Sequence, residues 1–259
     1  MEQLQSLTAQ VSHLTSLTSA MPQWVLADVY MDIAASTTAI KRGYMSRIVS
    51  VECKCAICGA TNVYRGLAST NISGGPDLDL RPAEMKRSTM HVWIQECPEC
   101  GYISKEVSDP SDVTREWLLS EKYLTCDEIL FESELAKQFY KYYLISLEDK
   151  NPENALFAVL HAAWACDDKN DDINAKHCRE LAISLATKLI ESNHDNKENI
   201  MLMRADLMRR AGQFETMIDA YASVQFDEEL LNQILRFEVE KAKEKNTACY
   251  RVADVTGKE

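Results

Sequence analysis

Four cysteines in two similar units carry the clearest chemistry in this sequence. The first unit is Cys-Ala-Ile-Cys-Gly at 55–59 and the second is Cys-Pro-Glu-Cys-Gly at 97–101. A Cys-x-x-Cys turn directs two thiolates at one point, and the glycine after it permits a backbone turn that aims amide N–H groups at the sulfurs. Two such turns make a closed tetrahedral site for a structural Zn²⁺. The predicted ligands are Cys55, Cys58, Cys97 and Cys100.

Two other interpretations of the cysteines remain open. Rubredoxin-type iron sites use the same paired turns and would make the chain an electron carrier. Only Tyr64, Trp93 and Tyr102 could supply the aromatic surroundings of such a centre, which favours zinc. A thiol switch is the second alternative, because Cys53 could compete as a ligand or disulfide partner; a strand cysteine facing a small core is the simpler interpretation. His91 could replace one cysteine, but its spacing from the second unit is wrong.

Short β-type runs surround the two cysteine units. A loop rich in glycine and proline (69–82) separates the units. We therefore expect a small zinc ribbon over residues 46–108, too small to fold without its metal. The predicted strands are 47–51, 62–65, 91–95 and 102–107.

The segment from Asp77 to Pro82, Asp-Leu-Asp-Leu-Arg-Pro, is the most unusual part of that loop. In an extended stretch the carboxylates of Asp77 and Asp79 face the same side, with Arg81 two residues further on. They could form a hard-cation site or a charged pocket for a partner. Two carboxylates alone bind a cation weakly. A salt-bridge cluster that pins the loop against the ribbon, with Leu78 and Leu80 packed inward, is therefore the favoured interpretation.

The chain from residue 109 to 259 is predicted to be entirely helical. Ser111 or Asp112 could cap the first helix, Ser133 caps the next, and Asn151-Pro152 begins a third. Apolar periodicity then continues to the C-terminal part of the chain. The predicted helices after Ser133 cover 134–147, a stretch from 152, 173–191, 196–211, 214–224 and 227–245.

Residues 207–221 carry the turn of a tetratricopeptide-type helical hairpin. Gly212 separates the two helices, Phe214 packs across the turn, and Met217, Ile218 and Tyr221 form the buried face of the second helix. A looser copy places Ala155, Val159 and Ala162 at equivalent positions 62 residues earlier. Stacked hairpins form a concave recognition surface, whereas an ordinary helical bundle is the alternative.

Residues 1–45 are predicted to form a separate helical segment. Leu4, Leu7, Val11 and Leu14 follow one another at steps of three and four, a heptad-like stripe within residues 1–21. Such a helix could dock on its own protein or support weak self-association. The sequence does not decide between them.

Composition and charge restrict the class of protein. The chain is globular in composition, with 46% hydrophobic residues and a net charge of −12, which opposes binding to duplex DNA. Only the segment 41–107 has a positive balance of charge, with nine Lys and Arg against seven Asp and Glu, so the charge argument does not apply to it. No apolar run could span a membrane and residues 1–20 are not a signal peptide, so we expect a cytoplasmic protein with reduced thiols. A nucleic-acid-binding ribbon remains the alternative function, using Lys54, Arg65, Arg81, Lys86 and Arg87.

The order of cysteine unit, acidic loop, second cysteine unit and the Arg-Ala-Gly-Gln-Phe turn at 210–214 resembles an uncharacterised family of prokaryotic zinc-ribbon and tetratricopeptide-like proteins, a domain of unknown function. The resemblance covers about residues 50–225. It implies a cytoplasmic location, zinc at the four cysteines and interaction through the helices. It implies no enzymatic activity.

The sequence therefore predicts an α+β protein that is mostly α: a zinc ribbon followed by a tetratricopeptide-like domain at 109–259. We expect a non-enzymatic adaptor that binds a protein partner through its helices. No phosphate-binding loop or nucleophile motif is found in the sequence. Five other residues could suggest catalysis but show no nucleophile–base spacing: His161, His177, His194, Cys166 and Cys178.

Overall fold

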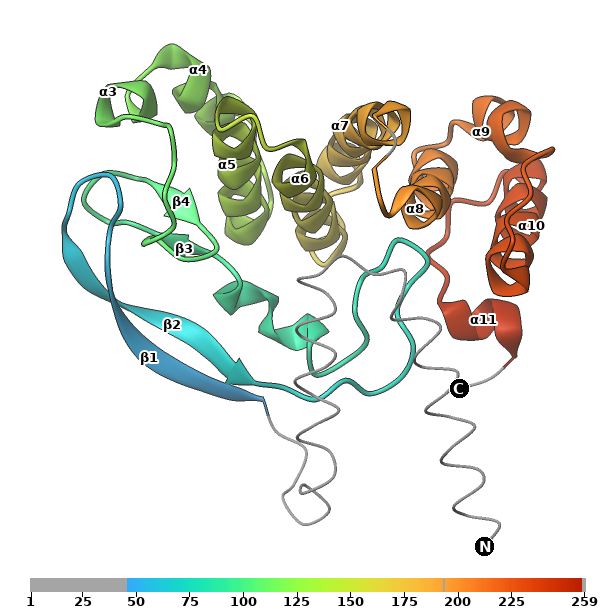
Figure 1. Ribbon diagram of the computed structural model, residues 1–259, viewed down its shortest axis with the longest axis horizontal. Coiled ribbons are helices and arrows are strands. Elements are labelled where there is room, and N and C mark those ends of the chain that lie inside the picture. The colour runs from blue at the N-terminus through green and yellow to red at the C-terminus, as the bar shows by residue number, and fades with distance from the viewer. Residues whose placement is uncertain (1–45, 193, 258–259) are drawn as a thin grey trace, which may run out of the picture.

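A computed structural model describes residues 46–192 and 194–257. A small β region is followed by a curved row of helices (Figure 1). The predicted α+β class with a predominance of helix is therefore confirmed. The helical segment predicted at 1–45, including the self-association stripe in residues 1–21, lies outside the described residues.

Two antiparallel β-hairpins form the ribbon, and each carries one cysteine unit in its turn. The first hairpin pairs β1 (Arg47–Lys54) with β2 (Thr61–Ser69). The second pairs β3 (Gln95–Glu96) with β4 (Ile103–Ser104). The strands predicted at 47–51 and 62–65 are confirmed, and both extend further than predicted.

The strand predicted at 91–95 is wrong for most of its length. The chain forms a 3₁₀ helix, η1 (Arg87–Val92), before the short strand β3 begins. Within η1, Thr89 Oγ1 donates to the Lys86 carbonyl and accepts from Trp93 Nε1 at 2.9 Å. These local side-chain bonds favour a turn of helix over a strand, which would place the same groups apart.

The strand predicted at 102–107 is reduced to β4 alone. Just beyond it, the Asp109 carboxylate accepts hydrogen bonds from the Ser104 hydroxyl and from the Glu106 N–H, at 2.9 and 3.0 Å. An aspartate that binds nearby backbone groups in this way stabilises a turn. The ladder therefore ends after two residue pairs.

The helical part begins with two single turns and continues with longer helices. The described helices are α3 (Arg115–Leu118), α4 (Glu121–Leu124), the 3₁₀ helix η2 (Thr125–Glu128), α5 (Glu134–Glu148), α6 (Pro152–Asp167), α7 (Asp172–Glu191), α8 (Lys197–Arg210), α9 (Phe214–Tyr221), α10 (Glu229–Lys243) and α11 (Val252–Thr256). Each predicted helix from α5 to α10 is present within a few residues of its expected bounds. The short α11 was not predicted, because five residues give too little periodicity to detect.

Capping side chains explain where the helices start. The Ser133 hydroxyl accepts from the Ala136 N–H and begins α5, and the Asn151 side chain does the same for α6, as predicted. The predicted cap at Ser111 or Asp112 is wrong, because Thr114 caps α3 instead. The Ser111 hydroxyl donates to the Asp149 carboxylate at the end of α5, and this bond anchors the chain before α3.

Consecutive helices pack side by side along the row. Helix α6 packs between α5 and α7, and α8 follows α7. Fully buried alanines on α6, including Ala155, Ala162 and Ala163, allow close approach of its neighbours. Helix α10 packs against both α8 and α9, so it fills the groove of that hairpin.

Two helices joined by a turn are present at residues 207–221, as α8, Gly212 and α9. Gly212 has φ of +79°, and Met217 and Tyr221 are buried. The looser copy is not equivalent, however. Only α7 and α8 lie between α6, which carries Ala155, and α9, which carries Met217. Two complete repeats would require three intervening helices, so the spacing of 62 residues does not describe a regular repeat.

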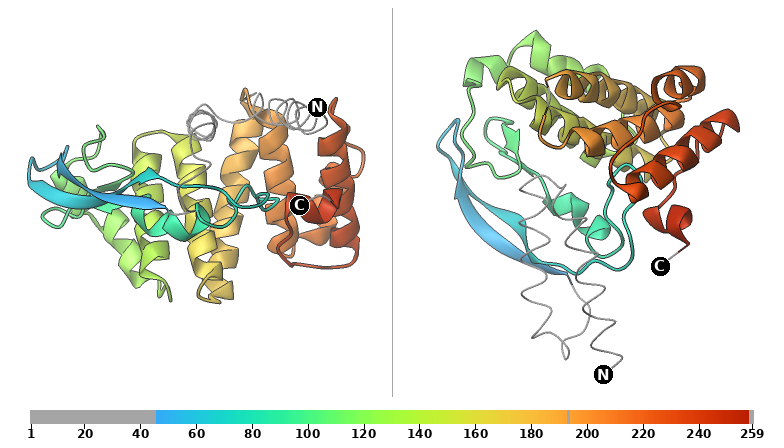
Figure 2. Two further views of the ribbon diagram at one scale, coloured as in Figure 1. Left: turned by 90° about the horizontal axis from the view of Figure 1, so that it is seen from below. Right: turned by 45° about the vertical axis from the view of Figure 1, so that its right-hand side comes forward.

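The loop that follows β2 crosses the inner side of the helix row (Figures 1 and 2). The part of the loop that carries Asp79 and Arg81 is bonded to the helices and not to the two hairpins, which corrects the sequence interpretation. Asp77 to Leu80 form a turn, with the Leu80 N–H donating to the Asp77 carbonyl at 2.9 Å and φ of +69° at Leu80. The turn buries Leu78 and directs the side chains of Asp79 and Arg81 at the helices. The inner surface of the row is therefore covered by the chain itself.

Candidate functional site: a four-cysteine centre and a buried charge network

The four predicted cysteine ligands come together at one point. Their sulfur atoms all lie within 4.8 Å of one another. Cys55 Sγ lies 3.7 Å from Cys100 Sγ, and Cys58 Sγ lies 3.6 Å from Cys97 Sγ. A tetrahedron with metal–sulfur bonds of ~2.3 Å has edges of ~3.8 Å. The cluster is therefore of the right size to hold one metal ion.

The two cysteine turns have the same backbone geometry. In the first, the Cys55 N–H donates to the Ala60 carbonyl at 2.8 Å and the Gly59 N–H donates to the Cys55 carbonyl at 3.0 Å. The equivalent bonds in the second turn measure 2.8 and 2.9 Å. Gly59 and Gly101 have φ of +74° and +73°. Glycine is favoured there by its conformation, since a Cβ at Gly101 would meet no atom within 4 Å.

Burial differs among the four thiols. Cys55 and Cys97 are almost fully buried, whereas Cys58 and Cys100 are half-buried. Burial raises the pKa of Cys55 and of Cys100, and the backbone N–H of Ala60 lowers the pKa of Cys58. A bound cation supplies the charge that deprotonates such thiols, so metal binding releases protons and weakens as the pH falls.

Aromatic hydroxyls surround the second cysteine turn. The buried Tyr64 hydroxyl has no hydrogen-bond partner among the described residues, and burial together with the neighbouring Cys97 raises its pKa to about 12. A thiolate bound to metal would give this hydroxyl an acceptor. The Tyr123 hydroxyl of α4 donates to the Gly101 carbonyl at 2.9 Å and ties the turn to the helical part. These surroundings fit an anionic metal–thiolate centre.

Further contacts join the ribbon to its neighbours. The Ala56 N–H donates to the Val107 carbonyl at 2.9 Å, which links the first cysteine turn to the segment that follows β4. The Glu96 carboxylate of β3 accepts from Gln138 and Lys141 of α5, at 3.2 and 3.3 Å. The centre is thus held between the two hairpins and the start of the helix row.

The other residues considered for the metal centre lie outside it. Cys53 is half-buried on β1 and is not part of the cluster. His91 is exposed on η1, with Nδ1 close to the Ser88 carbonyl. Of the aromatic residues considered for an iron centre, Trp93 packs on the His161 ring of α6, 5.4 Å away.

The five basic residues considered for nucleic-acid binding are divided between two environments. Lys54 and Arg65 are exposed on the first hairpin. Arg81 is buried and paired with Asp168, and Arg87 is paired with Asp77. Two of these cations are therefore committed to carboxylates of the chain itself.

A network of buried charges holds the loop against the helices. Asp79 is fully buried, and its Oδ2 accepts from Trp164 Nε1 of α6 at 2.8 Å and from Arg210 of α8 at 2.7 Å. The second nitrogen of the Arg210 guanidinium donates to Asp167 at 2.7 Å, and Asp167 also pairs with Arg179 of α7. A buried carboxylate is tolerated only when it is paired and hydrogen-bonded, and this one is.

Two more ion pairs flank Asp79 in the sequence. Arg81 donates to both oxygens of Asp168, at 2.7 and 2.6 Å, at the C-terminal end of α6. Arg87 pairs with Asp77 at 2.8 Å, which opposes the burial that raises the pKa of Asp77. Both carboxylates of the loop are therefore occupied by arginine, which leaves the predicted hard-cation site without free ligands.

The C-terminal part of the chain closes over the same loop. The Leu78 N–H donates to the Tyr250 carbonyl at 2.9 Å, and the Val252 N–H donates to the Pro76 carbonyl at 3.0 Å. Next to this contact, Arg209 is fully buried and bonds to Glu238 of α10 at 2.5 Å and to Asp206 at 2.6 Å. The loop is thus enclosed by α6, α8 and the C-terminal segment.

The helical partners of this network could not be recognised in the sequence. They are Asp167, Asp168, Arg179, Asp206, Arg209, Arg210 and Glu238. Charged residues at these spacings are equally typical of a solvent-exposed helix face, so the sequence carries no local signal for the network.

The histidines and thiols considered for catalysis take part in packing. His161 lies among aromatic rings, 5.0 Å from Phe139 and 4.8 Å from Trp164 between ring centroids. Cys166 and Cys178 are fully buried neighbours. His177 lies beside Tyr140, and His194 is 3.6 Å from Glu153.

Comparison with family models, with curated proteins and with solved structures finds no match to this chain. The resemblance to a zinc-ribbon and tetratricopeptide-like family therefore stays a prediction. Within residues 46–192 and 194–257, no helix combines the length and apolarity needed to cross a membrane.

The first prediction concerns the cysteine centre. We expect Cys97→Ser to lose its bound metal and to unfold the ribbon, because a four-thiolate site contributes an apparent ~10–16 kcal/mol near neutral pH. Limited proteolysis should cut within residues 46–108, while circular dichroism retains most of the helical signal. Cys53→Ser should keep both metal and protease resistance. A Cys97→Ser protein with a resistant ribbon and no metal would contradict a structural role for the ion.

The second prediction concerns the buried carboxylate of the loop. Asp79→Asn should lower the free energy of unfolding by about 3–5 kcal/mol, because it removes one partner of a buried ion pair. Chemical denaturation measures this change. Asp219→Asn is the matched control, since Asp219 is exposed on α9 and should change stability by less than about 0.5 kcal/mol. Equal stabilities of the two variants would show that the network does not stabilise the fold.

The third prediction concerns pH. Burial, aided by Lys105, Arg81 and Lys86, lowers the pKa of His161 from 6.5 to about 3. Between these values the unfolded chain binds a proton that the folded chain does not, so stability falls as the pH falls through this window. His161→Phe should reduce that loss by up to about 1.4 kcal/mol per pH unit. Denaturation at several pH values tests this, and the exposed His91→Phe should follow the parent protein. If the free energy of unfolding changed with pH in the same way in the parent, in His161→Phe and in His91→Phe, the prediction would be wrong.

Proposed function

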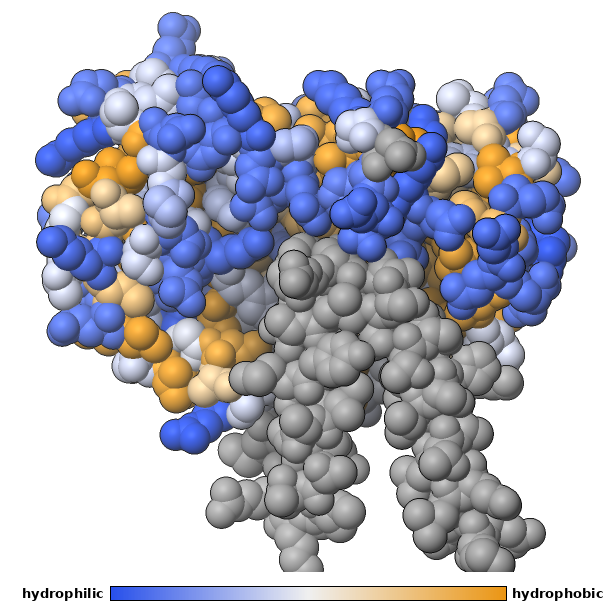
Figure 3. Space-filling view, viewed as in Figure 1, coloured by the Kyte–Doolittle hydropathy of each residue, from blue (hydrophilic) through white to orange (hydrophobic). Residues whose placement is uncertain are grey.

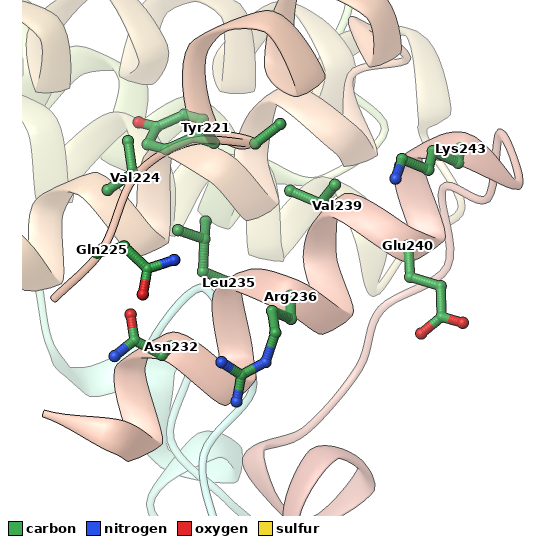
Figure 4. Close-up of a pocket in the computed structure, with 10 residues that line it drawn as sticks. Tyr221, Val224, Gln225, Asn232, Leu235, Arg236, Val239, Glu240 and Lys243 are labelled. Atoms are coloured by element: carbon green, nitrogen blue, oxygen red, sulfur yellow. The ribbon is translucent and has the colours of Figure 1, made fainter.

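We propose that the protein is a non-enzymatic adaptor that binds a protein partner through its helices, with a structural Zn²⁺ fixing the ribbon. The observation that carries this proposal is an open groove between α9 and α10, with a cavity of about 480 Å³ (Figure 4). Its lining includes the buried Tyr221, Leu235 and Val239 and the half-buried Val224, together with polar side chains such as Gln225, Arg236 and Lys243. Figure 3 shows apolar surface emerging between polar residues at this end of the row.

The position of the groove differs from the expectation for stacked hairpins. Their concave surface usually takes the partner, but here the inner side of the row is covered by the turn that carries Asp79 and Arg81. A partner would have to break buried ion pairs to reach that surface. The groove of the last long hairpin requires no such rearrangement, so we assign partner binding to it.

Zinc is the metal we assign to the four cysteines. A site made only of thiolates leaves no open position, which accords with a structural zinc ion. In the described part of the chain, none of the nine cysteines is paired in a disulfide, which accords with the proposed cytoplasmic location, where thiols stay reduced. Elemental mass analysis and visible absorbance of the purified protein test the assignment. We expect one zinc per chain and a colourless solution; iron with visible absorbance would support the rubredoxin-like alternative.

The fourth prediction tests the groove as the partner site. Val224→Glu places a charge at a half-buried apolar position of the groove and should lower partner capture at least tenfold, because an unpaired charge is costly in a desolvated interface. The full-length protein is immobilised and exposed to an extract of the cells that express it. Val63→Glu is the matched control, since Val63 is 66% exposed on the ribbon.

Proteins captured by the parent and by Val63→Glu but not by Val224→Glu would support the proposal. The same proteins captured by all three would place the binding surface elsewhere. Capture that is lost only with rising salt concentration, together with recovered nucleic acid, would favour the nucleic-acid alternative.

A further inference from the structure

Two hydrogen-bond donors on β2 are buried without a partner. Tyr64 Oη and Asn62 Nδ2 are shielded from solvent, and neither makes a hydrogen bond among the described residues. Buried polar side chains are usually hydrogen-bonded, because a donor without an acceptor destabilises the fold. Two such donors, so close together in one strand, therefore indicate a common acceptor beside the hairpin.

The pleat of the hairpin directs both donors toward the cysteine centre. Residues two apart in a strand project from the same face, whereas Val63 between them projects from the other face and is 66% exposed. The Tyr64 hydroxyl lies beside Cys97, and the Asn62 amide lies beside that hydroxyl. The amide, the hydroxyl and the Cys97 sulfur therefore follow one another in a row that ends at the centre.

The centre needs hydrogen-bond donors because it is an anion when it holds a divalent metal. Four thiolates and one such ion carry charges of −4 and +2, which leaves a net charge of −2. Backbone N–H groups supply part of the compensation; the Ala60 N–H, for example, donates to Cys58. Cys97 is fully buried, so a donor to its sulfur must come from the protein. A hydroxyl gives an ionised sulfur a stronger hydrogen bond than it gives a neutral group.

A second buried tyrosine, directly after the second cysteine turn, has a partner within the chain. The Tyr102 hydroxyl donates to the Asp109 carbonyl at 2.9 Å, so it is satisfied whether or not a metal is bound. For Tyr64 the ring alone would fill the same space, and phenylalanine would serve a purely structural role equally well. Its hydroxyl requires an acceptor, and the Cys97 thiolate of the metal-bound centre supplies one.

We propose that the Tyr64 hydroxyl donates a hydrogen bond to the metal-bound thiolate of Cys97, and that the Asn62 amide donates to the Tyr64 oxygen and holds the hydroxyl in place. Both are positioning residues, since neither ligates the ion and both act on it through Cys97. This inference rests on the metal centre of the proposed function and is independent of the partner surface. Residues that orient a metal ligand typically change metal affinity by roughly 10–100-fold.

Cobalt(II) bound to the full-length protein in place of zinc tests the bond to Cys97. A hydrogen bond lowers the energy of the sulfur lone pair, so its loss should shift the thiolate-to-cobalt charge-transfer band to longer wavelength. We expect this shift in Tyr64→Phe, with a cobalt affinity roughly 10–100-fold below that of the parent in competition with a chelator. Tyr102→Phe is the matched control, because it also removes one buried hydroxyl near the centre. It should leave the band in place and the affinity within about twofold.

A second pair of variants tests the role of Asn62. Asn62→Asp keeps the size of the side chain, removes its N–H donor and adds a negative charge on the face turned to the centre. It should lower cobalt affinity at least about tenfold. Val63→Asp adds the same charge to the exposed face of the same strand and should leave the affinity within about twofold. Equal losses in both variants would overturn the role of Asn62, because affinity would then depend on net charge and not on the donor.

The remaining outcomes separate this inference from the proposed function. A Tyr64→Phe protein with the band and the affinity of the parent overturns the inference and keeps the metal centre. Equal shifts in Tyr64→Phe and Tyr102→Phe also overturn it, because the effect would then not depend on the bond to Cys97. If Tyr64→Phe binds no cobalt, the comparison of Asn62→Asp with Val63→Asp decides. A parent protein without a thiolate–cobalt band overturns both the inference and the metal centre.

Discussion

A carboxylate without access to water must be neutralised by the protein, and Asp79 imposes this constraint on the whole chain. It is neutralised by Arg210 of α8 and receives a hydrogen bond from Trp164 of α6. These partners lie 131 and 85 residues away in sequence, so the loop can be buried only after the helices have assembled. The path of the loop then fixes where the ribbon lies, since β2 leads directly into it.

Two different kinds of interaction therefore stabilise two parts of the molecule, the ribbon and the loop. The ribbon has few large apolar side chains, and its two hairpins meet at a cluster of four cysteines that could hold a metal ion. The loop is joined to the helices by buried ion pairs, whose removal is costly because each leaves a charge unpaired. Together they cover the inner side of the row, which is why we propose the α9–α10 groove and not the inner side for partner binding.

Features set by local chemistry could be predicted from the sequence. The cysteine ligands follow from spacing within each unit, and the starts of α5 and α6 follow from capping by Ser133 and Asn151. Features set by distant partners could not. Asp79 was expected to face the ribbon, because no local pattern shows that its cation lies in α8. The strand predicted at 91–95 failed for a related reason, since Thr89 bonds the backbone and stabilises a turn of helix.

A double-mutant cycle between the loop and α8 tests the central claim most directly. Asp79→Asn and Arg210→Gln are compared singly and together by equilibrium denaturation. If Asp79 and Arg210 form a buried ion pair, the double variant leaves neither of these charges unpaired. Asp167, the other partner of Arg210, still pairs with Arg179 in that variant. The double variant is expected to be more stable, by about 2 kcal/mol or more, than the sum of the two single destabilisations would make it. Additive effects within about 0.5 kcal/mol would contradict it.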